Sequence, residues 1–138
     1  MDTPYKTTTN IYSHTSVPWQ QDILNDFLKK IEIYKDASCI DIGTGIVNNL
    51  STLLKFYGKI VAIDISENAL KTLQKRYIRN QNQITIRKMD AHHLDYPSAS
   101  FDLIVCAEML EHCLKPQDVL NECVRILKPG GYIIFSCP

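Results

Sequence analysis

The stretch "CIDIGTGI", residues 39–46, is an apolar strand that ends in an acid and runs directly into two glycines. Glycine lets the backbone adopt positive φ and approach a ligand closely, so Gly43 and Gly45 predict a strand–turn–helix crossing. In parallel sheets, ligands bind beyond the carboxyl ends of the strands. The stretch therefore predicts a parallel α/β sheet with a ligand at this turn, and the alternative is a tight turn without one.

The rest of the chain alternates between short apolar runs and helical periodicity, which predicts helices on both faces of a doubly wound, Rossmann-like parallel sheet. The expected strands are residues 38–42, 59–65, 84–88, 101–107 and 132–137, and the expected helices are 18–34, 47–57, 66–79 and 116–127. Residues 18–138 are expected to form a single domain. The polar residues 1–17 are expected to form an N-terminal arm, either a tail or a flap over a ligand.

Composition narrows the class of protein. Lys plus Arg and Asp plus Glu each number 15, so no global field attracts nucleic acid or an anionic membrane, and no nucleic-acid partner is expected. No apolar run approaches the roughly 20 residues that span a bilayer, and no transmembrane segment is expected. The 5 cysteines are odd in number and none lies in a CxxC pair, which predicts reduced thiols in a cytoplasmic protein.

Two acids indicate what the glycine turn would hold. Asp64 ends the second strand at about the spacing where a carboxylate accepts hydrogen bonds from ribose hydroxyls, although it could instead cap the next helix. The third glycine of a dinucleotide site is missing, because Asn48 occupies its place. Asp41 would repel a pyrophosphate but stabilise an ammonium. The pattern favours S-adenosylmethionine, and an NAD-dependent oxidoreductase is the alternative.

Four segments in series carry a family resemblance: "DIGTG", "AIDIS", "MDAHHLDYPSASFDLIVCAEMLEH" and "RILKPGGYIIFSCP". In this order, over residues 37–138, they resemble the motifs of class I S-adenosylmethionine-dependent methyltransferases. The resemblance is greatest to the small-molecule branch that includes the ubiquinone-biosynthesis O-methyltransferases. It implies the strand order 3-2-1-4-5 and O- or C-methylation of a small-molecule acceptor.

The resemblance assigns the cofactor site to residues at the strand ends: Asp41, Gly43 and Gly45 at the methionine end, Asp64 at the ribose, Ile65 on the adenine, Asp90 and Ala91 at the adenine edge, and Ala107 and Glu108 beside the methyl-transfer site. One position departs from the family pattern. Val47 stands where a further glycine is common, and its branched side chain is expected to narrow the site.

"EMLEH" places Glu108, Glu111 and His112 at i, i+3 and i+4, on one face if the segment is helical. Three interpretations stay open. His112, with Glu108 beside it, could act as a general base. The three side chains could bind Mg²⁺, as is thought of some ubiquinone-pathway O-methyltransferases that this stretch resembles. The segment could also be a solvated helix start. His92 and His93 are interpreted as loop residues.

The family fold normally has seven strands, whereas this chain stops after the fifth, without strands six and seven. The segment "YIIFSC" is then expected to be a bare apolar edge. A truncated chain, a homo-oligomer or other partner that covers the edge, and a vestigial protein are the three explanations. The first and third leave a non-catalytic remnant that binds S-adenosylmethionine as an alternative to an enzyme.

Overall fold

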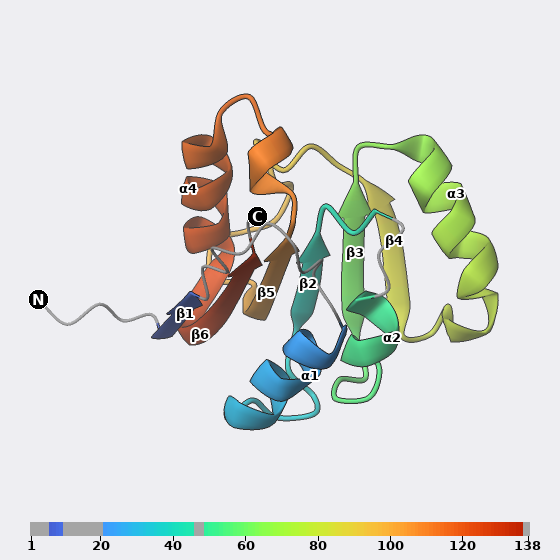
Figure 1. Cartoon of the computed structure of the whole chain (residues 1–138), viewed down its shortest axis with the longest axis horizontal. Coiled ribbons are helices and arrows are strands. Elements are labelled where there is room, and N and C mark those ends of the chain that lie inside the picture. The colour runs from blue at the N-terminus through green and yellow to red at the C-terminus, as the bar shows by residue number, and fades with distance from the viewer. Residues whose placement is uncertain (1–5, 10–20, 46–48, 137–138) are drawn as a thin grey trace, which may run out of the picture.

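The computed structural model describes residues 6–9, 21–45 and 49–136, which form one parallel sheet with helices around it (Figure 1). The strands are β1 Lys6–Thr9, β2 Cys39–Ile42, β3 Ile60–Asp64, β4 Ile84–Lys88, β5 Phe101–Ala107 and β6 Leu127–Ser136. The helices are α1 Gln21–Lys30, α2 Asn49–Leu53, α3 Glu67–Arg76 and α4 Pro116–Ile126, with single 3₁₀ turns η1 Ile78–Asn80 and η2 Leu110–His112.

The order of the sheet is β1-β6-β5-β2-β3-β4, and every pairing is parallel. Among the five strands that the sequence predicts, this is the order 3-2-1-4-5, so that prediction is confirmed. Chain order reverses at β2, which pairs with β3 on one side and β5 on the other. The carboxyl end of β2, where the glycine turn begins, is therefore the topological switch point of the sheet.

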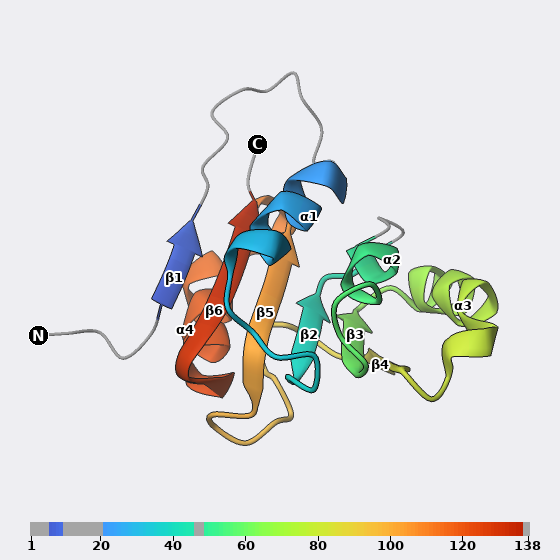
Figure 2. The ribbon, with the colours of Figure 1, turned by 90° about the horizontal axis from the view of Figure 1, so that it is seen from below.

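Two apolar layers sandwich the sheet, because successive side chains of a strand point to opposite faces. Cys39 faces a layer built with α1, α2 and α3, whereas Ile40 and Ile42 face a layer built with α4 and the loop after β4. Figure 2 shows α1 and α4 on opposite sides of the strands. Both faces are covered, which is the doubly wound arrangement that the sequence predicts.

The strand β1 is absent from the sequence-based expectation. It pairs with β6 from Lys6 opposite Tyr132 to Thr9 opposite Phe135. The expectation of a bare β6 edge is thus wrong, because a segment of the same chain pairs along it. The flap proposed for the arm would involve residues 1–5 and 10–17, which lie outside the described residues, and residues 6–9 belong to the sheet.

Other differences concern where elements end. The third predicted helix stops at Arg76, and the exposed Ile78 belongs to η1. The "KPGG" segment, residues 128–131, lies within β6, although the expected strand begins only at residue 132. Gly131 fits there because an added Cβ would lie 2.8 Å from the Asp102 carbonyl oxygen.

Within the part of the chain that the structure describes, no helix combines the length and the apolar character needed to cross a membrane.

Candidate functional site

Asp41 is the most deeply buried acid at the carboxyl end of β2, with no exposed surface. Its Oδ2 accepts a hydrogen bond of 2.8 Å from Thr44 Oγ1, whereas its Oδ1 has no hydrogen-bond partner. Burial raises the pKa of Asp41 to about 7, although the polar side chains of Thr44 and Asn49 act in the opposite direction. A buried carboxyl oxygen without a partner fits a cationic group at this position.

The glycine turn follows with both glycines at positive φ, +68° at Gly43 and +52° at Gly45. An added Cβ at Gly43 would lie 2.5 Å from Met109 Cγ, so this glycine allows the segment after β5 to approach the turn. The amide of Thr44 donates to the Ile63 carbonyl at 3.0 Å, which attaches the turn to β3. The expectation about Val47 concerns residues 46–48, which lie outside the described residues.

Asp64, at the end of β3, holds two backbone amides. Its Oδ2 accepts from Gly45 N at 2.7 Å and its Oδ1 accepts from Ser66 N at 2.8 Å. Ser66 is the N-cap of α3, with its side chain accepting from Ala69 N. Asp64 therefore joins the glycine turn to β3, and its carboxylate oxygens each retain a lone pair for a further donor. Ile65 beside it is 65% exposed, which leaves an apolar surface next to the turn.

Asp90 follows β4 and is oriented by His92, two residues further along the chain. Its Oδ1 accepts from His92 N at 2.9 Å and lies 2.7 Å from His92 Nδ1. These hydrogen bonds hold the pKa of Asp90 below its usual value. The Met89 amide donates to the Asp64 carbonyl at 3.1 Å, so this loop begins beside the end of β3. Ala91 packs against the apolar layer under α4.

The segment after β5 bends sharply. Ala107 is buried, and Glu108 has φ +50°, a left-handed conformation that is strained for a residue with a side chain. The Glu108 amide donates to Ser136 O and to Ser136 Oγ, each at 3.0 Å. These contacts from β6 hold the bend in place.

The proposed metal triad is not formed. The segment holds only the 3₁₀ turn η2, which starts after Glu108, so the shared α-helical face expected for Glu108, Glu111 and His112 does not exist. His112 is 79% exposed and lies 3.7 Å from Glu111. Among the described residues, no three His, Cys, Asp or Glu side chains gather closely enough to hold a metal ion. The residues present therefore do not fit Mg²⁺, and His112 as a general base stays a prediction.

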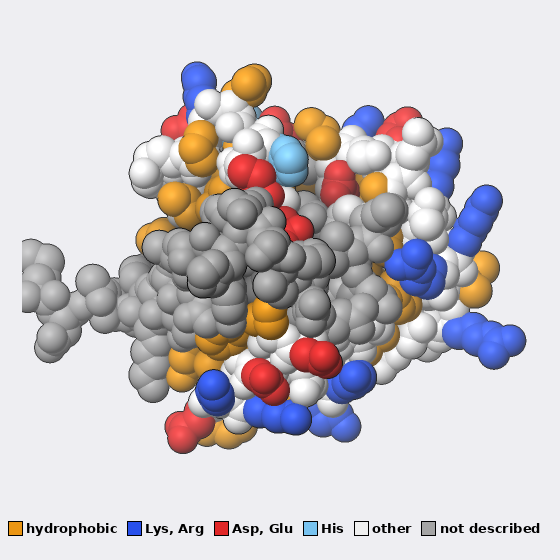
Figure 3. All heavy atoms as spheres, in the orientation of Figure 1, with side chains coloured by type: hydrophobic (Ala, Val, Ile, Leu, Met, Phe, Trp, Pro, Cys, Tyr) orange, Lys and Arg blue, Asp and Glu red, His pale blue; other side chains and the backbone are white. Residues whose placement is uncertain are grey.

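The structure thus brings the ends of β2, β3 and β4 together through direct contacts: Gly45 to Asp64, Thr44 to Ile63, and Met89 to Asp64. Acidic side chains and a histidine lie near one another in the upper part of Figure 3, on the side toward which β2 and β3 point in Figure 1. A groove of about 460 Å³ lies elsewhere, between α3 and β4, and none of the predicted site residues lines it.

Four residues at this end of the sheet were missed by the sequence reasoning: Thr44, His92, Met109 and Ser136. Thr44 and His92 follow their acids at three and two residues, a local spacing that suits a side-chain contact to a carboxylate. Met109 and Ser136 contact the site through pairing of distant strands, and no local pattern indicates them.

Comparison with known proteins gives one family match. The model of a family described as "Methyltransferase domain" matches residues 40–135. A ubiquinone biosynthesis O-methyltransferase of Coxiella burnetii is 33% identical over 103 residues, 74% of this chain and 44% of that protein. The same-named protein of Methylococcus capsulatus is 34% identical over 98 residues, 70% of this chain and 41% of that protein. The chain therefore spans less than half the length of these curated relatives.

Solved structures share the fold. A SAM-dependent methyltransferase from Aquifex aeolicus superposes with a TM-score of 0.71 at 24% identity, over 79% of this chain and 61% of that one. The [4+2]-cyclase SpnF superposes with a TM-score of 0.74 at 22% identity, over 89% of this chain and 48% of that one. Because a protein titled as a cyclase has the same fold, the fold by itself does not define the reaction.

Proposed function

Since the chain belongs to the methyltransferase domain family, we propose that it binds S-adenosylmethionine at the carboxyl ends of β2, β3 and β4. We propose further that it takes part in methylation of a small-molecule acceptor, on oxygen or carbon.

The observation that carries the proposal is the partnerless, buried Oδ1 of Asp41 beside two glycines with positive φ. An α-ammonium group would satisfy that oxygen and ionise the carboxyl, whereas the pyrophosphate of NAD would face a carboxylate. Asp64 would accept the ribose hydroxyls, and the exposed Ile65 would pack on the adenine. Asp90 and Ala91 would bind the adenine edge, and Ala107 and Glu108 would border the acceptor.

The bound cofactor would supply a methyl group that its sulfonium already activates. The chain's own task is then alignment of the acceptor and exclusion of water, which can contribute roughly 7–11 kcal/mol in favourable cases. The names of the relatives support a phenolic or hydroxyl acceptor. His112 would accept the acceptor's proton at one ring nitrogen, which its exposed position allows.

A second candidate is a module that binds the cofactor without transferring its methyl group. The fold allows it, because the fold by itself does not define the reaction. Product formation with an acceptor distinguishes the two, because both require cofactor binding. The buried thiols of Cys39, Cys106 and Cys123 support the additional proposal of a reducing, cytoplasmic setting.

Calorimetric titration of the chain with S-adenosylmethionine, and with NAD in parallel, tests the proposal. We expect micromolar binding of the first ligand alone. Asp64→Ala should weaken it at least about tenfold, because a partly buried hydrogen-bond acceptor for the ribose is lost. Asp36→Ala removes an exposed acid in the turn before β2 and should leave the affinity unchanged.

Binding of NAD in preference to S-adenosylmethionine, or no binding by a chain that circular dichroism shows to be folded, would overturn the proposal. An unchanged affinity in Asp64→Ala would remove the ribose assignment alone.

A further inference from the structure

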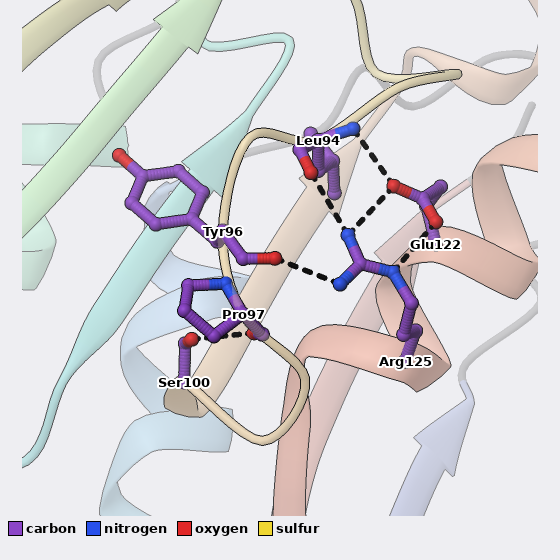
Figure 4. A network of polar contacts seen from close by, with 6 residues as sticks. All are labelled: Leu94, Tyr96, Pro97, Ser100, Glu122 and Arg125. Carbon is purple, nitrogen blue, oxygen red and sulfur yellow. Dashed lines mark hydrogen bonds and ion pairs between the residues drawn. The ribbon is translucent and has the colours of Figure 1, made fainter.

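A polar network joins α4 to the loop between β4 and β5, and the proposed function leaves it unused (Figure 4). Arg125 donates from Nη1 to the Tyr96 carbonyl at 2.7 Å and from Nη2 to the Leu94 carbonyl at 2.8 Å. Glu122 Oε2 accepts from the Leu94 amide at 2.8 Å. The two side chains therefore bind both backbone polar groups of Leu94.

The two side chains also hold each other. Arg125 Nε donates to Glu122 Oε1 at 2.8 Å, and Nη2 donates to Oε2 at 2.9 Å, which is a two-bond fork between guanidinium and carboxylate. They are 34% and 21% exposed, so water competes less than at an open surface pair. The pair thus forms a preorganised unit whose remaining hydrogen bonds all go to the loop backbone.

The loop that this pair holds also carries Asp90. On one side of Asp90, the Met89 amide is bonded to the Asp64 carbonyl. On the other side, Leu94 is fixed by Glu122 and Arg125, and its side chain is buried in the layer under α4. His92 holds the carboxylate of Asp90 from within the segment. Residues 89–94 are therefore fastened at both ends.

We propose that Glu122 and Arg125 are positioning residues that set the base specificity of the cofactor site, by holding residues 89–94 so that Asp90 accepts the exocyclic amino group of adenine. This inference rests on the proposed function. The alternative is a purely structural role, in which Glu122 and Arg125 only attach the loop to α4. In that case, removing the pair changes the stability of the chain but not the preference for adenine.

Base choice is measured with two ligands, S-adenosylmethionine and its hypoxanthine analogue, which has a C6 carbonyl in place of the amino group. The wild type should prefer adenine by at least about tenfold, because a carboxylate rejects a carbonyl oxygen. Arg125→Met keeps the aliphatic stem, removes the guanidinium and should reduce the preference to about twofold. Arg79→Met, an exposed arginine of η1, is the matched control and should retain the full preference.

A double-mutant cycle measures whether Arg125 acts on the base preference through Asp90. A purely structural role of Arg125 would give no such coupling. Asp90→Ala should abolish the preference, and Asp90→Ala/Arg125→Met should lose no more of it than Asp90→Ala alone. If Arg125→Met does not fold, Glu122→Gln replaces it, since the amide keeps an acceptor for Leu94 but weakens the fork.

A folded Arg125→Met or Glu122→Gln variant that keeps the full preference would overturn the inference, as would additive losses in the cycle. Failure of the proposed function is distinct, because the wild type itself would then not bind S-adenosylmethionine.

Discussion

Asp41 shows how a single buried carboxyl couples the fold to pH. Because burial raises its pKa to about 7, the folded chain keeps a proton on Asp41 between about pH 4 and pH 7, where the unfolded chain has released it. The folded state binds more protons across this window. The contribution of Asp41 to the unfolding free energy is therefore greatest at low pH and falls as the pH rises to 7.

Asp41→Asn removes this titration while it keeps an acceptor for Thr44 Oγ1. We expect the variant to gain stability relative to the wild type as the pH rises from 4.5 to 8, by at most about 1.4 kcal/mol per pH unit within the window. Urea unfolding at pH 4.5, 6 and 8 measures the difference. The exposed Asp36→Asn should show no such trend, and a difference for Asp41→Asn that is constant with pH would contradict the assignment.

Gly43 is constrained twice, by its φ of +68° and by the approach of Met109. Gly43→Ala should reduce the unfolding free energy by about 3 kcal/mol, from the left-handed backbone and from overpacking together. Adding Met109→Ala should recover the packing part, about 1 kcal/mol or more, but not the backbone part. Denaturant unfolding of the single and double variants measures both.

Gly58 provides the control for this pair, because an added Cβ there meets nothing within 4 Å. Gly58→Ala should therefore change stability by only a few tenths of a kcal/mol. Additive effects of Gly43→Ala and Met109→Ala would show that the two side chains do not meet.

At the scale of elements, strands were predicted better than helix ends. β4 and β5 have the predicted bounds, and in β5 the reason is that a strand buried on both faces shows as a nearly continuous apolar segment. The segment after β5 was predicted on helical spacing, and it forms only η2. Ser136 holds Glu108 in its left-handed conformation from a strand 28 residues away, which local spacing does not encode.

The loop between β4 and β5 gives the same lesson about the candidate site. Its sequence places Asp90 after a strand, which is enough to suggest a ligand contact. What fixes the loop comes from α4, through Glu122 and Arg125, which on sequence alone are an ordinary i,i+3 pair on a helix. The sequence was thus enough to predict which residues belong to the candidate site. The contacts that orient these residues depend on tertiary packing, so the sequence did not predict them.

At the scale of the whole molecule, the sheet order followed from the family resemblance and from the switch point that the glycine turn marks. The strand β1 could not be found in this way, because its four residues are polar and carry no apolar period. Its position is set by the free edge of β6, whose Ile133 and Ile134 are buried in the two opposite layers. A short polar strand of this kind leaves little signal in its sequence.

The pairing of β1 with β6 predicts how the molecule behaves when the strand is removed. Deletion of residues 1–9 leaves the backbone groups of the "YIIF" segment, residues 132–135, without their neighbouring strand. An apolar edge of this kind pairs with other chains. We expect the shortened chain to self-associate more strongly than the full chain, with a sedimentation coefficient that rises with protein concentration.

The matched control is deletion of residues 1–5, which shortens the same arm but retains β1. Sedimentation velocity over a hundredfold range of concentration, about 1 to 100 μM, compares the three chains in the range where exposed edges associate. The full chain and the shorter deletion should behave alike. If deletion of residues 1–9 leaves the concentration dependence unchanged, β1 does not protect the edge, and the covering role assigned to it is wrong.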